Sequence, residues 1–92
     1  MDTITEGNNK FYIGASEEKP IAEITFRRAG SDTLIIDHTY VSEELRGQGI
    51  ARKLLDKVVA YARQEQKKII PVCSYAAKVM KGNPEFEDVL KE

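Results

Sequence analysis

The stretch from Val41 to Arg63 constrains the fold more than any other, because it joins a strand end, a glycine loop and a long amphipathic helix. Gly47 and Gly49 lack a Cβ atom, so the loop can adopt positive φ and approach a ligand closely. The helix that follows directs its first N–H groups, and the positive end of its dipole, into the loop. This order of elements predicts a binding site for a phosphate or pyrophosphate group.

The apolar residues that follow the loop recur with the period of a helix. They are Ile50, Ala51, Leu54, Leu55, Val58, Val59 and Ala62. Such spacing buries one face and leaves the charged residues on the other, so we expect a helix from Gly49 to about Gln66. The mostly apolar segment 68–73 then predicts a strand, and Pro71 within it favours an edge or a bulge.

Three segments before the loop have the composition of strands. They are Lys10–Ala15, Ile21–Arg28 and Thr33–Val41. The polar turns at 16–20 and 29–32 are short, which predicts an antiparallel meander. The third strand is the longest and is apolar at its start, so we expect it to be central. A right-handed crossover through the helix would set strand 68–73 parallel to it.

The C-terminal part predicts short helices. Ser74 is expected to cap a helix that ends near Lys81, where the sequence Gly82-Asn83-Pro84 stops it. Proline at a first helical position predicts a further turn or two from Pro84 to Leu90. The predicted fold is therefore α+β: an antiparallel meander, a crossover helix, a parallel strand and short C-terminal helices, in one domain of residues 1–92.

Composition limits the classes of function. The net charge is −1 and no basic tail is present, which excludes general binding to nucleic acid or to an anionic membrane. No apolar run approaches the roughly 20 residues of a membrane span, and the polar N-terminus does not resemble a signal peptide. One histidine and one cysteine do not make a metal site. A lone cysteine also predicts a reducing, cytoplasmic setting.

The order Arg46-x-x-Gly49-x-Ala51, directly after a β-branched strand, resembles the acyl-CoA pyrophosphate loop of the GNAT superfamily of N-acetyltransferases. That superfamily has the pattern Arg/Gln-x-x-Gly-x-Gly/Ala. The resemblance covers about residues 21–79, and flanking elements found in longer members are missing. Further motifs are similar to a small, single-domain subgroup: His38-Thr39, Pro71-x-Cys73-Ser74 and Asn83-Pro84-Glu85-Phe86. The resemblance implies acetyl-CoA or coenzyme A as the cofactor.

The resemblance also implies which residues contact the cofactor. The expected pyrophosphate cradle, acting mainly through backbone N–H groups, comprises Arg46, Gly47, Gln48, Gly49, Ile50 and Ala51. Arg52 and Lys53 are candidates for the remaining phosphate, with a solvated basic helix face as the alternative.

The strand before the loop is the expected site of the acyl group. In the superfamily a bulge there opens backbone groups to the thioester, and a backbone N–H polarises the acyl carbonyl as an oxyanion hole does. The residues that line this edge are Thr39, Tyr40 and Val41. Ser74, after the next strand, completes the candidates for cofactor binding.

Three residues are candidates for catalysis. His38 is a candidate general base, with a hydrogen-bonded strand residue as the alternative. Cys73 ends the strand that is expected to lie across from Val41, near a helix start. There it could accept an acyl group or form a mixed disulfide with CoA, with a small buried side chain as the alternative. Many superfamily members have a tyrosine that acts as general acid at the position where this chain has Met80. Tyr75 is the candidate substitute, with packing as the alternative.

The leading hypothesis is an acyltransferase that moves an acetyl group from acetyl-CoA to an amine, directly or through Cys73. The main alternative is a non-catalytic module that binds CoA or a protein partner. A third is an anion-binding α+β domain unrelated to CoA. The acceptor is a small molecule or a protein amine, and the chain is expected to be a monomer or weak homodimer, because a sheet edge is left uncovered.

Overall fold

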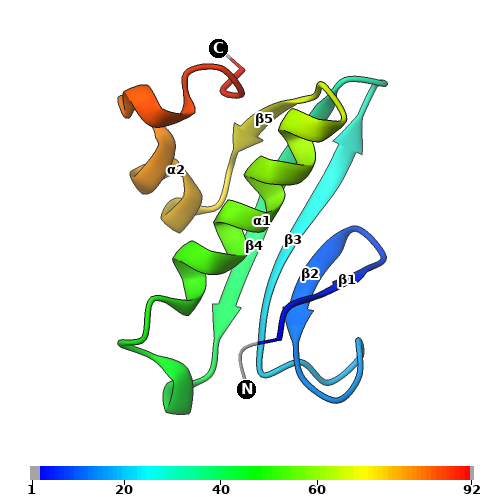
Figure 1. Ribbon diagram of the computed structural model, residues 1–92, viewed down its shortest axis with the longest axis vertical. Helices are drawn as coiled ribbons and strands as arrows, with labels where there is room; N and C mark the ends of the chain where they lie inside the picture. The colour runs from blue at the N-terminus through cyan, green and yellow to red at the C-terminus, as the bar shows by residue number, and fades with distance from the viewer. Residues whose placement is uncertain (1–2, 92) are drawn as a thin grey trace.

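The computed structural model describes residues 3–91 and contains a mixed sheet whose strands follow the chain order (Figure 1). The strands are β1 (Thr5–Gly7), β2 (Lys10–Ile13), β3 (Ala22–Ala29), β4 (Thr33–Val41) and β5 (Lys68–Pro71). The helices are α1 (Ile50–Gln64) and α2 (Ser74–Met80), with 3₁₀ turns η1 (Glu43–Leu45) and η2 (Pro84–Phe86). Strands β1 to β4 pair antiparallel and β5 joins β4 in parallel. No helix in the described part is both long and apolar enough to span a membrane.

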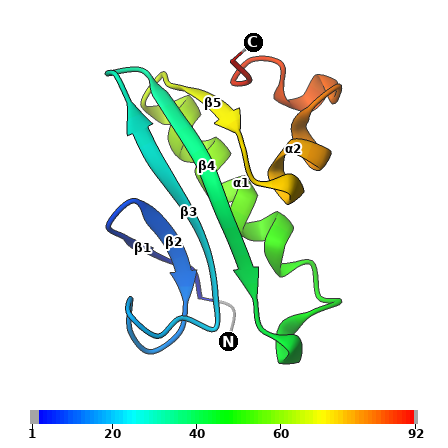
Figure 2. The ribbon, with the colours of Figure 1, turned by 180° about the vertical axis from the view of Figure 1, so that it is seen from behind.

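The core lies between α1 and one face of the sheet. Helix α1 crosses in front of the sheet in Figure 1 and behind it in Figure 2. Its apolar face supplies the buried residues Ile50, Leu54, Leu55, Val58, Val59 and Ala62. The sheet supplies Phe11, Ile13, Ala22, Ile24, Phe26, Leu34, Ile36 and Ile69 from alternate positions. Because α1 covers only one face, the side chains on the other face of β3 and β4 are polar or partly exposed.

A bulge divides β4 into two parts. In the pairing of β3 with β4, Thr25 lies opposite His38 but Phe26 lies opposite Ile36, so Asp37 is an extra residue. The pairing with β5 ends at the same point, because the last pair joins Ile36 to Pro71. Beyond it, residues 37–41 of β4 have β3 on one side and an opening toward β5 on the other. We call this opening the split.

Most of the expected elements are confirmed, including the meander, the crossover helix and the parallel strand with Pro71 at its end. That strand lies at an edge of the sheet, as the proline suggested. Strand β4 is internal as expected, although β3 occupies the middle position. The sequence did not reveal β1, because Thr5 and Glu6 are exposed and carry no apolar alternation.

The expected cap of α2 is wrong by one residue. Cys73, not Ser74, is the N-cap, and its sulfur accepts a hydrogen bond from the N–H of Ala76. The C-terminal turn forms as η2, and Leu90 then makes a single parallel bridge to Ile69. The segment after α2 is thereby fastened back to the free edge of β5.

Candidate functional site

Both glycines of the loop have the backbone that only glycine adopts easily. Gly47 has φ +84° and Gly49 has φ +73°. A Cβ atom built at either position would meet no heavy atom within 4 Å outside its chain neighbours. These glycines therefore serve the left-handed backbone and keep the space above the loop open, rather than making room for another part of the protein.

The N-terminus of α1 opens into the same space. Gly49 is the N-cap and has no side chain with which to cap the helix. The first helical hydrogen bond runs from the N–H of Lys53 to the carbonyl of Gly49, at 3.1 Å. The N–H groups of residues 50–52 precede it and have no acceptor within the helix. The first turn contains no acidic residue, so the positive end of the dipole is balanced by no carboxylate of that turn.

A pocket of about 250 Å³ lies against this helix terminus. It is lined by Val41, Leu45, Arg46, Gly47, Gly49, Ile50, Ala51, Arg52 and Tyr75. The fold thus brings most of the predicted cofactor residues together from β4, the loop and α1, and adds Tyr75 from α2. Leu45, which the sequence analysis did not single out, forms part of the wall. Its apolar side chain is partly buried against the core.

Some candidates lie outside this lining. Gln48 is exposed and its side-chain amide donates to the carbonyl of Glu44 at 3.3 Å, so it braces the loop from outside. Lys53 and Ser74 are exposed on α1 and α2. Arg46 both lines the pocket and bonds to the backbone, because its Nε donates to the carbonyl of Val41 at 3.2 Å.

The backbone of β4 beyond the bulge faces the split at alternate residues. The N–H of Ser42 donates to the carbonyl of Ile21, directly before β3, at 2.9 Å. Neighbouring residues of a strand direct their polar groups to opposite sides, so the N–H groups of Val41 and Thr39 point away from β3 and into the split. The hydrogen bond from Arg46 to the Val41 carbonyl is consistent with this orientation.

Cys73 lies on the opposite wall of the split. Its Sγ is 3.3 Å from the hydroxyl oxygen of Thr39, across the opening between β4 and β5. The N–H of Ala76 also approaches the sulfur at 3.3 Å. Cys73 is half-buried and is not in a disulfide. A thiol with two polar neighbours in an opening of the sheet is placed to accept a group that enters the split.

His38 and Tyr40 occupy the other face of the sheet. His38 is paired with Thr25, whereas Thr39 is paired with the fully buried Ile24 on the α1 side. The His38 side chain is 57% exposed, and its Nε2 is 3.9 Å from a carboxylate oxygen of Glu23. Tyr40 is 41% exposed on the same face. The fold therefore separates His38 from Cys73 by the thickness of the sheet.

Tyr75 projects into the pocket wall from the start of α2. Burial raises the pKa of its phenol above the ordinary 10.0, and the positive charge of Arg52 opposes part of that rise. The phenol is therefore protonated at neutral pH and can donate a proton to a group held in the pocket.

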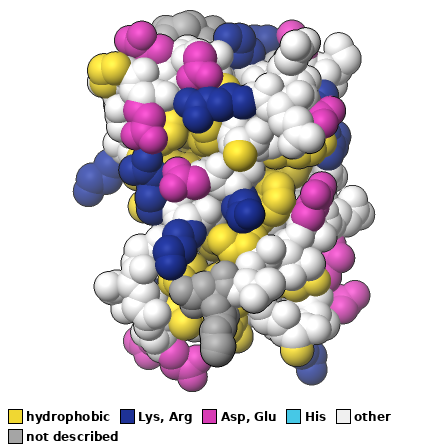
Figure 3. Space-filling model, viewed as in Figure 1, with side chains coloured by type: hydrophobic (Ala, Val, Ile, Leu, Met, Phe, Trp, Pro, Cys, Tyr) yellow, Lys and Arg dark blue, Asp and Glu magenta, His cyan; other side chains and the backbone are white. Residues whose placement is uncertain are grey.

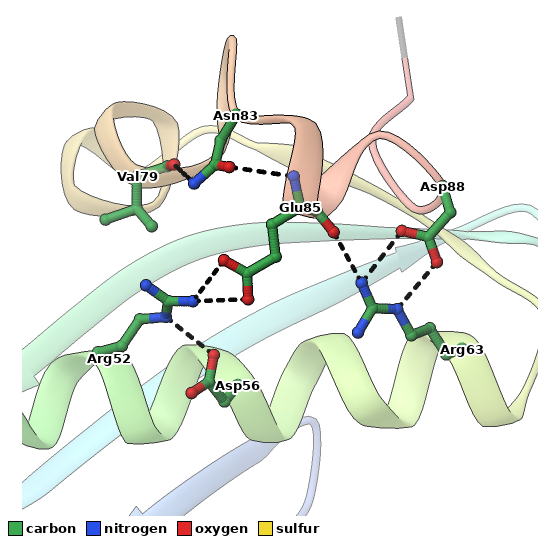
Figure 4. Close-up of polar contacts among 7 residues, drawn as sticks. All are labelled: Arg52, Asp56, Arg63, Val79, Asn83, Glu85 and Asp88. Carbon is green, nitrogen blue, oxygen red and sulfur yellow. Dashed lines mark hydrogen bonds and ion pairs between the residues drawn. The ribbon is translucent and has the colours of Figure 1, made fainter.

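Arg52 is held by two carboxylates that the sequence analysis did not connect with it (Figure 4). Its Nε donates to Asp56 at 2.9 Å, and its Nη2 donates to both oxygens of Glu85 at 2.9 and 3.0 Å. The hydrogen bond to Asp56, followed by that to Glu85, raises the pKa of Arg52 above its ordinary value. The pair with Asp56 has the helical i, i+4 spacing, but the contact with Glu85 joins residues far apart in sequence.

Comparisons with known proteins agree with this geometry. The family model for GCN5-related N-acetyl-transferases matches residues 10–89. An NMR solution structure of a GCN5-like candidate N-acetyltransferase from Staphylococcus aureus is 45% identical, with a TM-score of 0.81, and the match covers 97% of this chain and 87% of that one.

Two further proteins are more distant. Protein NATD1 of Xenopus tropicalis is 32% identical over 63 residues, which are 68% of this chain but only 58% of NATD1. A GNAT family acetyltransferase from Elizabethkingia anophelis, with acetyl-CoA bound, shares the fold at 21% identity and a TM-score of 0.54, over 67% of this chain and 40% of that one. Both the family match and the fold lead to one conclusion: the chain belongs to the GCN5-related N-acetyltransferase family.

Proposed function

We propose that this protein binds acetyl-CoA and transfers the acetyl group to an amine acceptor. The observation that carries the proposal is the pocket that joins the open glycine loop and the α1 N-terminus to the wall of the split at Val41. Its positive-φ glycines, uncapped N–H groups and Arg46 suit a pyrophosphate. The relative from Elizabethkingia anophelis holds acetyl-CoA, which supports the same ligand here.

Each residue that faces the split or the pocket has a separate role in the proposed reaction. Acetyl-CoA, when bound, supplies an activated acetyl thioester. The N–H of Val41 is directed to polarise a carbonyl in the split. Cys73 is the nucleophile: its sulfur forms a bond to the acetyl carbon while the bond from that carbon to the CoA sulfur breaks. Tyr75 gives a proton to the departing CoA sulfur and regains one from the Cys73 thiol, so the phenol is restored. An amine then attacks the acetyl carbon, and its proton passes to the Cys73 sulfur as the bond from that carbon to the sulfur breaks, which regenerates the thiol.

Two observations favour this covalent route over direct transfer aided by His38. Cys73 lies inside the split, 3.3 Å from Thr39 on the facing wall. His38 lies on the other face of the sheet, beside Glu23. The same separation supports a second candidate function, a CoA-binding module without turnover. Among the described residues, the sulfur of Cys73 is hydrogen-bonded to Thr39 and to the N–H of Ala76, and neither group is a general base.

The experiment combines a titration with a mass measurement. Backbone amide shifts are followed as CoA and acetyl-CoA are added, and the intact protein is weighed afterwards. We expect shifts centred on residues 46–52 with either ligand, and an added acetyl group with acetyl-CoA alone. Shifts without added mass would favour direct transfer or the binding module. No shifts at millimolar ligand would contradict CoA binding altogether.

The setting of the protein is part of the proposal. We propose that it acts in the cytoplasm, where its unpaired thiol is kept reduced. The chain acts as one domain, residues 1–92, and as a monomer or weak homodimer.

A further inference from the structure

Arg52 is fixed to the C-terminal segment as well as to its own helix (Figure 4). Glu85 binds its Nη2 through both carboxylate oxygens, at 2.9 and 3.0 Å. The guanidinium carbon lies 5.2 Å from the ring centroid of Phe86, which is 1% exposed and belongs to the core. The bidentate contact and the aromatic face together define one orientation for the guanidinium.

The same residue lines the proposed phosphate pocket. Arg52 is the third residue of α1, at the positive end of the dipole, and its side chain forms part of the pocket wall. A guanidinium in this place matches the geometry of a phosphate as well as that of a carboxylate. A phosphate in the pocket and the carboxylate of Glu85 therefore compete for the N–H groups of Nη2.

The charges around Arg52 disfavour an anionic ligand, because carboxylates outnumber arginines there. Two arginines, 52 and 63, face three carboxylates, Asp56, Glu85 and Asp88, all within the contacts drawn in Figure 4. Their net charge is −1. Over the face in Figure 3, basic and acidic side chains are likewise interspersed. Glu85 thus occupies Nη2 of a cation that lines the pocket, and it places a negative charge beside that cation.

We propose that Glu85 determines the affinity of the pocket for phosphate groups, by holding Arg52 on the C-terminal segment and away from the ligand. This inference rests on the proposed function, because it concerns the same pocket. With Glu85 in place, the pyrophosphate is bound by the loop N–H groups and Arg46. Without it, Nη2 of Arg52 is released, while the separate contact of Nε with Asp56 remains.

The test is a double-mutant cycle on ligand affinity. Dissociation constants for CoA and for inorganic pyrophosphate are measured by amide titration in the wild type and in Glu85→Gln, Arg52→Ala and the double variant. We expect Glu85→Gln to tighten binding of both ligands about fivefold, the size of one solvent-exposed ion pair. The gain should shrink at high salt, because exposed charges are screened. In the Arg52→Ala background, Glu85→Gln should give no gain.

The matched control is Asp88→Asn. It breaks the contact of Arg63 with the same C-terminal segment, at 2.9 Å, but neither residue lines the phosphate pocket. We expect it to leave both dissociation constants unchanged. If it tightens binding as much as Glu85→Gln, loosening of the segment is the cause and the inference is wrong.

Two further outcomes overturn the inference. Equal affinity of Glu85→Gln and wild type would show that the negative charge of Glu85 does not determine the affinity of the pocket. A gain that survives in the double variant would show that loss of negative charge alone is responsible. Either leaves the proposed function standing, since the wild type still binds CoA. Failure of the wild type to bind CoA or pyrophosphate would overturn both.

Discussion

Gly49 joins two properties in one residue, a left-handed backbone and an open space where a side chain would stand. We predict that Gly49→Ala costs about 1 kcal/mol in the free energy of unfolding, because alanine is strained at positive φ. We also predict that it weakens CoA binding more than tenfold, because a methyl group would project into the space above the loop. Urea unfolding and amide titration measure the two effects.

The chain offers a matched control for this substitution. Gly30 has a similar φ of +68° in the turn between β3 and β4, and its Cβ would meet only Asp32, at 4.0 Å. Gly30→Ala should lose similar stability yet keep the wild-type affinity for CoA. Equal affinity of the two variants would contradict the role given to Gly49.

Cys73 serves as a helix cap and as the proposed nucleophile, and serine separates these roles. Serine is a better N-cap than cysteine, because its oxygen accepts the hydrogen bond from Ala76 more strongly. We therefore predict that Cys73→Ser keeps or raises the thermal midpoint but loses the acetyl adduct in intact mass. A variant that remains acetylated at the same level would place the acyl group elsewhere.

At this scale the sequence predicted the loop well and the split less well. Glycines, a strand and a helix in one order have a direct physical meaning, so the loop structure of residues 46–51 could be predicted from the sequence, and their role in binding a phosphate stays a prediction. The position of His38 could not, because the bulge at Asp37 changes which side chains share a face. Alternation counted from Leu34 and Ile36 would place His38 toward the core, and only the extra residue puts it on the other face.

The C-terminal segment is attached to α1 and β5 by ion pairs and a bridge. The hydrogen bond from Arg63 lowers the pKa of Asp88 below the ordinary 3.8. A carboxylate whose pKa is lowered by folding stabilises the protein above its unfolded-state pKa, and this contribution is lost as the pH falls through the folded-state pKa. The attachment is therefore sensitive to acid.

We predict that the thermal midpoints of wild type and Asp88→Asn differ at neutral pH and converge as the pH falls below 3.8. The reason is that asparagine and a protonated aspartate both lack the charge that Arg63 binds. Calorimetry over a pH series provides the measurement. A difference that persists in strong acid would assign the effect to shape or hydrogen bonding rather than to charge.

The boundary of a helix or strand can be predicted from the sequence where the chemistry of a single residue determines it. Pro71 could be assigned to an edge strand because proline has no backbone N–H to donate to a neighbouring strand. The cap of α2 could not be assigned correctly, because Ser74 is the better capping residue on local propensity. The choice between adjacent residues is made by tertiary contacts, here those of Cys73 with Thr39 and with the carbonyl of Ile36.

Phe86 connects the C-terminal segment to the core of the whole molecule. It is 1% exposed and packs in the same cluster as the residues of α1. We predict that Phe86→Ala costs about 3–5 kcal/mol in the free energy of unfolding, through lost burial and the cavity left behind. Equilibrium denaturation in urea measures it, with the slope as a check of two-state behaviour. A loss below about 1 kcal/mol would show that the segment is dispensable to the core.

The topology of the molecule was predictable because short turns favour neighbouring strands and crossovers are right-handed. The point at which the pairing of β5 with β4 ends could not be predicted from the sequence, because it depends on the lengths of α1 and of its two connections. The contact between Arg52 and Glu85 was equally hidden, because it joins residues 33 apart.

The two walls of the split are far apart in the chain. Thr39 and Cys73 are separated by 34 positions, and helix α1 lies between them in the chain. Closing so long a loop is among the slower steps of folding, because its entropic cost precedes the contacts that reward it. A nascent chain that has completed only the meander and the glycine loop therefore lacks the second wall of the split, and the proposed acyl transfer requires that β5 has been synthesised and has paired with β4.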